Sequence, residues 1–214
     1  MNPSPSLLGQ YAPPSAVAGC PRLLAHQASD LFALWQAWEE ECGARRDVPY
    51  WAIVWPAARV LSQYLFANPT LVQGRSVLDC GCGGGVTAIA AIANGARRAA
   101  GCDLDLTAVG IAQLNAAVNG VSIDFEHRDV VECCAAQRFD LILVADLFYQ
   151  KEFSVSLLAA LAAAQAQGAE ILIADSGRPF LPKEGLREIH AQAVTTSFDI
   201  EGCRSRTVRL FRLP

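Results

Sequence analysis

The stretch Val77-Leu78-Asp79-Cys80-Gly81-Cys82-Gly83-Gly84-Gly85 decides the fold of this chain. An apolar run ends in an acid and passes into glycines, and the Ala-rich segment 86–93 follows. This order predicts a buried strand, a tight loop and a helix. Glycines at such a turn allow positive φ angles and let a ligand approach the backbone, while the first N–H groups of the helix are free to donate. The stretch therefore indicates a nucleotide-type site.

The loop fits a dinucleotide poorly. In the GxGxxG pattern the sixth position is Gly or Ala, and counting from Gly81 this position is Val86. The acid Asp79, two residues before the first glycine, suits a ligand that carries an ammonium, as S-adenosylmethionine does. The motif Asp-x-Gly-x-Gly-x-Gly resembles the glycine-rich loop of the seven-strand S-adenosylmethionine-dependent methyltransferases, which implies cofactor contacts at Asp79, Gly81 and Gly83.

Length and composition limit the classes of protein to consider. The 214 residues suit one α/β domain, and 52% of them are hydrophobic. No apolar run reaches the roughly 18 to 20 residues that span a bilayer, and no secretory signal is evident, so we expect no membrane partner and a cytoplasmic protein. A net charge of −4 disfavours a nucleic-acid partner. We also expect a monomer.

The eight cysteines form no CxxC pair, so the sequence predicts no metal site. Several fall at predicted strand ends, such as Cys80 and Cys102, where a cysteine packs as a small hydrophobic side chain. Reduced cysteines also fit the cytoplasm.

Residues 1–27 contain five prolines and are predicted to be an extended arm without a regular helix, ahead of a single domain at 28–214. A helix capped near Asp30 is expected to run to about Cys42. Three large aromatic residues then lie within 49–56, among them Trp51 and Trp55. They either plug the edge of the sheet or line a pocket for an adenosyl group and an alkylammonium.

Two acids follow predicted strands after the glycine loop. Asp103 ends the strand 98–102, about twenty residues beyond the loop, where an acid can accept hydrogen bonds from ribose hydroxyls. The alternative role, capping the next helix, suits Asp105 better. Asp129 follows the strand 121–127 and is a candidate acceptor for the adenine amine, although a surface turn would also account for it.

The run 139–145 is apolar enough for a strand buried on both faces, and it brings Asp146-Leu147-Phe148-Tyr149 to the same edge of the sheet. An acid and a phenol three residues apart at this edge are candidate catalytic groups. The alternative is that Asp146 caps the helix 151–167 and Tyr149 only packs. Beyond it we expect a strand at 170–174, a short helix at 183–192, and two final strands at 193–200 and 207–213.

Over residues 28–214 the chain resembles the bacterial relatives of the electron transfer flavoprotein β-subunit lysine methyltransferases, within the seven-strand methyltransferases that carry an Asp-x-x-Tyr motif. The resemblance rests on segments that occur in the family's order: 49–52, 55–56, the glycine loop, 146–149 and 175–178. It implies a Rossmann-like α/β fold with a mostly parallel seven-stranded sheet in the order 3-2-1-4-5-7-6, the last strand antiparallel, and helices on both faces. Family members commonly have Gly-Gly where this chain has Ala57-Ala58.

The resemblance implies methyl transfer from S-adenosylmethionine to a protein lysine, with the electron transfer flavoprotein β subunit as the candidate partner. Asp146 and Tyr149 are then the catalytic residues, Trp51 and Phe148 line the substrate pocket, and Trp55, Asp103 and Asp129 contact the cofactor. Two alternatives stay open: a small-molecule N- or O-methyltransferase, and a cofactor-binding module without activity.

Overall fold

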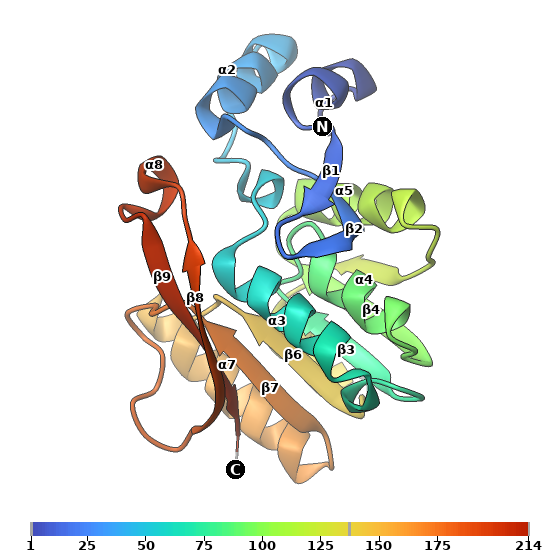
Figure 1. Cartoon of the computed structure of the whole chain (residues 1–214), viewed down its shortest axis with the longest axis vertical. Helices are drawn as coiled ribbons and strands as arrows, with labels where there is room; N and C mark the ends of the chain where they lie inside the picture. Colours follow the sequence, from blue (N-terminus) through green and yellow to red (C-terminus); the bar gives the residue numbers. More distant parts are fainter. Residues whose placement is uncertain (1, 137, 214) are drawn as a thin grey trace.

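The apolar run Ser76–Cys80 forms strand β3 at the centre of a seven-stranded sheet in the computed structural model, which describes residues 2–136 and 138–213. All five residues of β3 are buried, because strands lie on both sides of it and helices cover both faces (Figure 1). The sheet order is β5-β4-β3-β6-β7-β9-β8. Numbered within this sheet, it is the predicted order 3-2-1-4-5-7-6, and the prediction is confirmed.

The central strands are parallel, and the sheet changes direction only at its C-terminal end. β3 pairs in parallel with β4 and β6, and β9 pairs antiparallel with both β7 and β8. The elements, in chain order, are α1 (Pro5–Tyr11), β1 (Pro14–Val17), β2 (Cys20–His26), α2 (Leu31–Cys42), η1 (Tyr50–Ala52), α3 (Pro56–Ala67), η2 (Pro69–Leu71), β3, α4 (Val86–Ala93), β4 (Arg98–Asp103), α5 (Leu106–Val118), β5 (Asp124–His127), α6 (Val130–Ala136), β6 (Leu141–Ala145), α7 (Lys151–Ala166), β7 (Glu170–Asp175), β8 (Arg187–Thr195), α8 (Phe198–Glu201) and β9 (Ser205–Arg212).

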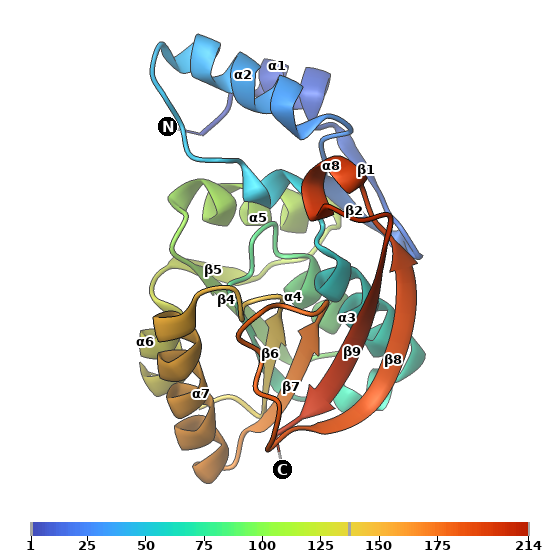
Figure 2. The same ribbon diagram turned by 90° about the vertical axis from the view of Figure 1, so that its left-hand side faces the viewer.

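Two hydrophobic cores lie on opposite faces of the sheet. One packs α3, α4 and α5 against it, with Leu61, Ile89 and Leu143 among its fully buried members. The other lies under α6 and α7 and includes Phe148 and Leu161. Figure 2 shows α6 and α7 together on one side of the sheet and α3 and α4 behind its strands. Within the described residues, no helix is long and apolar enough to cross a membrane.

The prediction of an extended arm at residues 1–27 is wrong, because this segment holds a helix and a hairpin. Helix α1 begins with Pro5 at its first position, where the missing N–H costs nothing, and the Ser4 hydroxyl accepts a bond from the Leu7 N–H at 3.2 Å. Pro14 is the first residue of β1. Leu7 and Leu8 pack with the buried face of α2, and α1 and α2 lie side by side at the N-terminal end (Figure 1).

The helix predicted at 183–192 is also wrong. Strand β8 occupies Arg187–Thr195, and burial alternates along most of it with a period of two, as on an edge strand with one covered face. The strand predicted at 193–200 therefore starts earlier and ends at Thr195. A four-residue helix, α8, follows and ends at Gly202, whose φ of +67° favours glycine.

Candidate functional site

The glycine loop between β3 and α4 has three residues at positive φ: Gly81, Gly83 and Gly85. At Gly81 a Cβ would lie 2.5 Å from the end of the Leu147 side chain, and the φ of +61° also favours glycine. At Gly83 a Cβ would meet nothing within 4 Å, which leaves open space beside the backbone. The loop thus combines one glycine that packs against the protein with one that borders free space where a ligand can approach.

Asp103 at the end of β4 holds this loop. One of its carboxylate oxygens accepts a bond from the Gly83 N–H at 2.8 Å, and the other from the Asp105 N–H at 3.0 Å. Burial raises the pKa of Asp103, and the two N–H donors offset part of that rise. Asp105 accepts from the Thr107 N–H and caps α5, as the sequence indicated. Asp103 therefore lies beside the glycine loop with its charge partly compensated.

Asp79 lines a pocket that the glycine loop borders. Its side chain accepts a bond from the Ala88 N–H in the first turns of α4 at 3.0 Å, and burial raises its pKa well above the ordinary range. A cation bound nearby would stabilise its ionised form. The pocket is lined by Ala25, Trp51, Ile53, Val54, Trp55, Ala58, Asp79, Gly81, Cys82, Gly83, Gly84, Val86, Thr87, Asn115 and Ala145.

Trp51 and Trp55 both line this pocket, so the aromatic segment 49–56 forms part of its wall. Trp51 is buried and meets the Trp38 ring edge-on, with centroids 6.1 Å apart. The Trp55 ring lies under the Arg178 guanidinium, 5.2 Å from it, and its indole N–H donates to the Tyr50 carbonyl. Trp51 and Trp55 thus help to form the same pocket, and their roles towards a substrate and a cofactor stay predictions.

Asn115 is a pocket residue that the sequence reasoning missed. Its Nδ2 donates to the Gly84 carbonyl at 2.8 Å, and its Oδ1 accepts from the His26 N–H at 2.8 Å and lies 2.7 Å from His26 Nδ1. The side chain is completely buried. It joins the end of β2 to the glycine loop. The signal was available, because Asn115 is a polar residue on the apolar face of the helix 106–118.

Asp146 follows β6 and accepts four hydrogen bonds. Oδ1 accepts from the Ser176 N–H at 2.9 Å, the Ser176 hydroxyl at 2.6 Å and Arg178 Nε at 3.0 Å, and Oδ2 accepts from the Ala57 N–H at 3.0 Å. Its φ of +58° is a strained backbone conformation for a non-glycine residue. Asp146 does not cap α7, because the N-cap of that helix is Gln150. It joins β6 and β7 to the N-terminus of α3.

Arg178 and Glu201 extend this network, and the sequence analysis assigned no role to either of them. Arg178 binds Asp146 and also Glu201, whose other oxygen pairs with Arg206 at 3.1 Å. Burial alone would lower the pKa of Arg178, but the carboxylates of Asp146 and Glu201 outweigh it and raise that pKa. Only 4% of the Glu201 side chain is exposed, so its two arginine partners compensate a buried charge.

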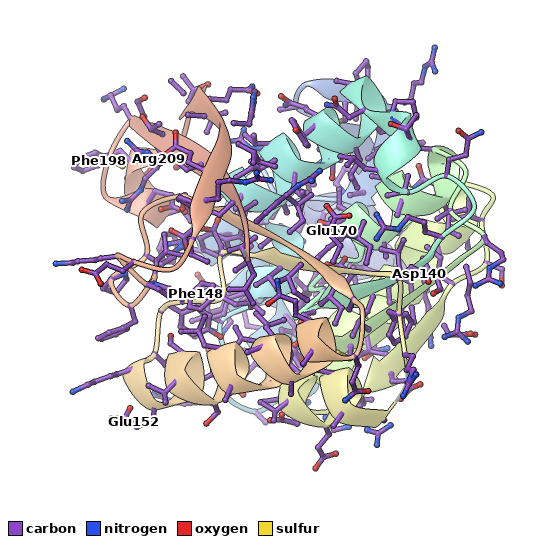
Figure 3. All side chains as sticks on the ribbon, turned by 90° about the horizontal axis from the view of Figure 1, so that it is seen from below. Asp140, Phe148, Glu152, Glu170, Phe198 and Arg209 are labelled. Atoms are coloured by element: carbon purple, nitrogen blue, oxygen red, sulfur yellow. The ribbon has the colours of Figure 1, made fainter. Side chains whose placement is uncertain are left out.

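Phe148 does not line a pocket, which corrects the prediction. It is completely buried in the core under α7, and Figure 3 shows it between that helix and the sheet. Asp146, two residues earlier, has a left-handed backbone conformation. Tyr149 remains at the edge of the sheet, 54% exposed. Partial burial raises its pKa, and the nearby Asp103 and Tyr50 add to the rise.

Asp129 does not line the pocket, and its Oδ1 accepts from the Val131 N–H at 2.7 Å in the first turn of α6. Its role towards adenine stays a prediction. The described residues hold no cluster of three or more metal-ligating side chains, and the eight cysteines are free thiols. Cys80 and Cys134 lie buried with their sulfurs 3.7 Å apart.

Comparison with known proteins shows the family to which the chain belongs. The family model described as "Ribosomal protein L11 methyltransferase (PrmA)" matches residues 61–174, which is more than half of the chain and runs from within α3 to the last but one residue of β7. The chain belongs to this family. The matched region contains the glycine loop, Asp103, Asp129 and Asp146, whereas the aromatic segment and the β8–β9 hairpin lie outside it.

Among similar proteins, the electron transfer flavoprotein beta subunit lysine methyltransferase of Rattus norvegicus is 41% identical over 133 residues, covering 61% of this chain and 52% of that protein. The ribosomal protein L11 methyltransferase of Laribacter hongkongensis is 42% identical over 92 residues, covering 43% of this chain and 29% of that protein. The chain thus spans about half, or less, of the length of these relatives.

The N-methyltransferase NodS of Bradyrhizobium japonicum, solved in complex with S-adenosyl-L-homocysteine, superimposes on this PrmA-family chain with a TM-score of 0.55 at 18% identity, covering 84% of this chain and 98% of that one. At this identity the match shows a common fold.

Proposed function

We propose that this protein transfers a methyl group from S-adenosylmethionine to the side-chain amine of a lysine in a protein acceptor. The observation that carries the proposal is the contact between Asp103 and the Gly83 N–H at 2.8 Å, next to open space at Gly83 and at a pocket that the buried acid Asp79 also lines. An anion-binding loop would leave the N–H groups unpaired for phosphate. Here a carboxylate already holds the loop, which favours a ligand with hydroxyl and ammonium groups.

The residues present fit this cofactor. Asp103 would accept hydrogen bonds from ribose hydroxyls, Gly81 and Gly83 would let the ligand approach the backbone, Asp79 would balance an ammonium, and Trp55 would contact the adenosyl group. We keep Asp129 as the candidate acceptor for the adenine amine. Bound in this way, S-adenosylmethionine supplies a methyl group on a sulfonium.

The chain's own residues have two tasks in such a transfer: to align the amine with the methyl carbon and to keep water out. A lysine amine must also lose its proton, and a carboxylate alone would favour the charged form. We assign Asp146 to orient the amine, because its Oδ2 accepts only one hydrogen bond among the described residues and retains a lone pair. Proton loss then proceeds through water, and Tyr149 and Trp51 shape the entrance.

The names of the relatives support a protein acceptor. The rat relative is named for the electron transfer flavoprotein beta subunit, and relatives with the same name from Mus musculus and Homo sapiens are 39% and 38% identical. We therefore propose this subunit as the acceptor. We also propose that the protein works as a monomer in the cytoplasm, where its eight free cysteines would stay reduced.

One experiment separates this acceptor from its rivals. The protein is incubated with labelled S-adenosylmethionine and, in parallel, with purified electron transfer flavoprotein β subunit, ribosomal protein L11, or a set of small amines and alcohols. Label on a lysine of the β subunit supports the proposal. Label on L11 alone, or on a small molecule alone, would show that the acceptor is that molecule and not the β subunit. The absence of label in every reaction would overturn the methyltransferase proposal.

A further inference from the structure

A second cavity, of about 210 Å³, lies beside the first pocket. Its walls come from the segment after η1, the first turns of α3, and the tip of the β8–β9 hairpin with α8, and Figure 2 shows this tip above the start of α3. Ile53 and Val54 line both cavities. The residues around it are Ile53, Val54, Pro56, Arg59, Thr195, Thr196, Ser197, Ile200 and Glu201.

Arg59 is the one basic residue in this lining, and the described residues do not compensate its charge fully. Its Nη2 donates to the Thr195 carbonyl at 2.7 Å, and its Nε is buried with no hydrogen-bond partner in the described part of the chain. No carboxylate of those residues forms an ion pair with it. Burial lowers the pKa of Arg59, and the more distant Glu201 and Asp146 offset only part of that effect.

The neighbouring acids are already paired. Glu201 binds Arg178 and Arg206, and Asp146 binds Arg178, so three arginines, including Arg59, surround two carboxylates. A third acid, Asp175, lies near Asp146 and Arg178 but is not among the carboxylates that act on Arg59. Arg59 is therefore the arginine of this group whose charge has no ion-pair partner among the described residues. A partly buried positive charge of this kind favours an anionic partner.

The size of the cavity selects the kind of anion. Ligand pockets for whole small molecules are usually about 300 to 1,000 Å³, and this cavity is smaller. Its apolar walls, formed by Ile53, Pro56 and Ile200, suit the methylene groups of a side chain. A glutamate or aspartate side chain matches both the volume and the charge.

We propose that this cavity binds an acidic side chain of the acceptor protein, and that Arg59 recognises its carboxylate. The inference rests on the proposed function, and it adds that the enzyme recognises an acidic side chain in the acceptor. Because Ile53 and Val54 border both cavities, the acid and the methylated lysine belong to one stretch of the acceptor chain. Phe198, 59% exposed on α8 and at the outer end of the hairpin in Figure 3, adds apolar contact surface at the edge of the cavity.

The test measures methylation of the electron transfer flavoprotein β subunit by wild type, Arg59→Met and Arg59→Lys. We expect Arg59→Met to raise KM for this acceptor by roughly tenfold or more, since it removes one partner of a desolvated charge pair. We expect kcat and cofactor affinity to stay within about twofold, and Arg59→Lys to recover part of the loss.

Gln192→Ala is the matched control. Gln192 Nε2 donates to Gln63 Oε1 at 2.7 Å, so this residue also ties β8 to α3, about one helical turn from Arg59, but it does not line the cavity. If Gln192→Ala raises KM as much as Arg59→Met, the effect comes from anchoring the hairpin, and the inference is overturned. An unchanged KM in Arg59→Met overturns it as well.

Substitution in the acceptor completes the test. Each acidic residue near the methylated lysine is changed to its amide, and one such change should raise KM for wild type but not for Arg59→Met. If the effect of every acceptor substitution on KM simply adds to the effect of Arg59→Met, no acidic residue of the acceptor pairs with Arg59 and the inference is contradicted. Absence of methylation by wild type with every acceptor tested would instead reject the proposed function, so the two failures are distinguishable.

Discussion

The main-chain N–H of Ala57 donates a hydrogen bond to Asp146, with Oδ2 3.0 Å from the nitrogen. Ala57 is in the first turn of α3 and Asp146 follows β6, so this contact fixes the start of a helix to the edge of the sheet where the candidate site lies. The same carboxylate holds Ser176 and Arg178 after β7. Three segments that border the site therefore depend on one acid.

Asp146→Asn should lower the free energy of unfolding by about 2 to 4 kcal/mol, because an amide presents N–H groups to donors and leaves Arg178 with Glu201 as its one remaining charge partner among the described residues. Only 5% of the Asp146 side chain is exposed, so solvent does little to relieve the loss. Denaturant unfolding measures the change. Glu152→Gln, at an exposed acid in the first turn of α7, is the control and should change stability by no more than about 0.5 kcal/mol. Equal losses of unfolding free energy in the two variants would show that the hydrogen bonds of Asp146 do not stabilise the fold.

The same substitution should reduce methyl transfer by at least ~10²-fold while cofactor affinity stays within a few-fold. The rate is measured at a temperature where the variant is folded. Ser176→Ala removes one donor to Asp146 but keeps its charge, so it should lose far less activity. Normal turnover in Asp146→Asn would reject the catalytic role, and lost cofactor binding would assign Asp146 to the cofactor pocket.

Asn115→Ala should weaken cofactor binding, because the Gly84 carbonyl and the His26 N–H both lose a buried partner, at a cost of about 1 to 3 kcal/mol. Asn119→Ala, at the C-cap of the same helix, is the control. Asn119 binds the Leu24 N–H and carbonyl, and so ties β2 to α5 without touching the glycine loop. Calorimetric titration of both variants separates the roles. If both variants lose cofactor affinity equally, the affinity depends on how the β1–β2 hairpin packs against α5 and not on the hydrogen bond to Gly84.

Asp175 should make stability fall as pH rises through a defined range. Its Oδ2 is buried without a partner among the described residues, and burial, helped by the nearby Asp146, raises its pKa from 3.8 to about 6. The folded protein thus binds this proton more tightly than the unfolded chain, so the stabilising effect is complete below 3.8 and is lost by about 6.

The variant Asp175→Asn cannot titrate at this position. Its stability relative to wild type should therefore rise with pH between 3.8 and about 6, as followed by denaturant unfolding at several pH values. A difference that stays constant over this range would contradict the raised pKa.

The sequence predicted the sheet and the loop because β3, β6 and β7 are apolar runs that end in acids or glycines, and these patterns depend on local chemistry. The prediction failed for residues 1–27, where prolines suggested an irregular arm. Pro5 and Pro14 are in fact the first residues of a helix and of a strand, and these are positions where proline is tolerated. It failed for β8 because an edge strand half covered by α3 carries few apolar residues.

Within the site, the sequence identified acids at strand ends but not what they bind. The partners of Asp146 are an N–H at residue 57 and side chains at 176 and 178, which only the folded chain brings together. Phe148 was misplaced for a related reason. The left-handed backbone conformation of Asp146, with a φ of +58°, has no signature in the sequence because the residue is not glycine.

The most direct test of the account is calorimetric titration of the protein with S-adenosylmethionine, S-adenosylhomocysteine and NAD. We expect the first two to bind and NAD not to bind, and Asp103→Ala to lose about 1 to 3 kcal/mol of binding free energy, because a carboxylate is removed from hydroxyl donors and from the Gly83 N–H. Binding of NAD in place of S-adenosylmethionine, or binding of neither, would contradict the account.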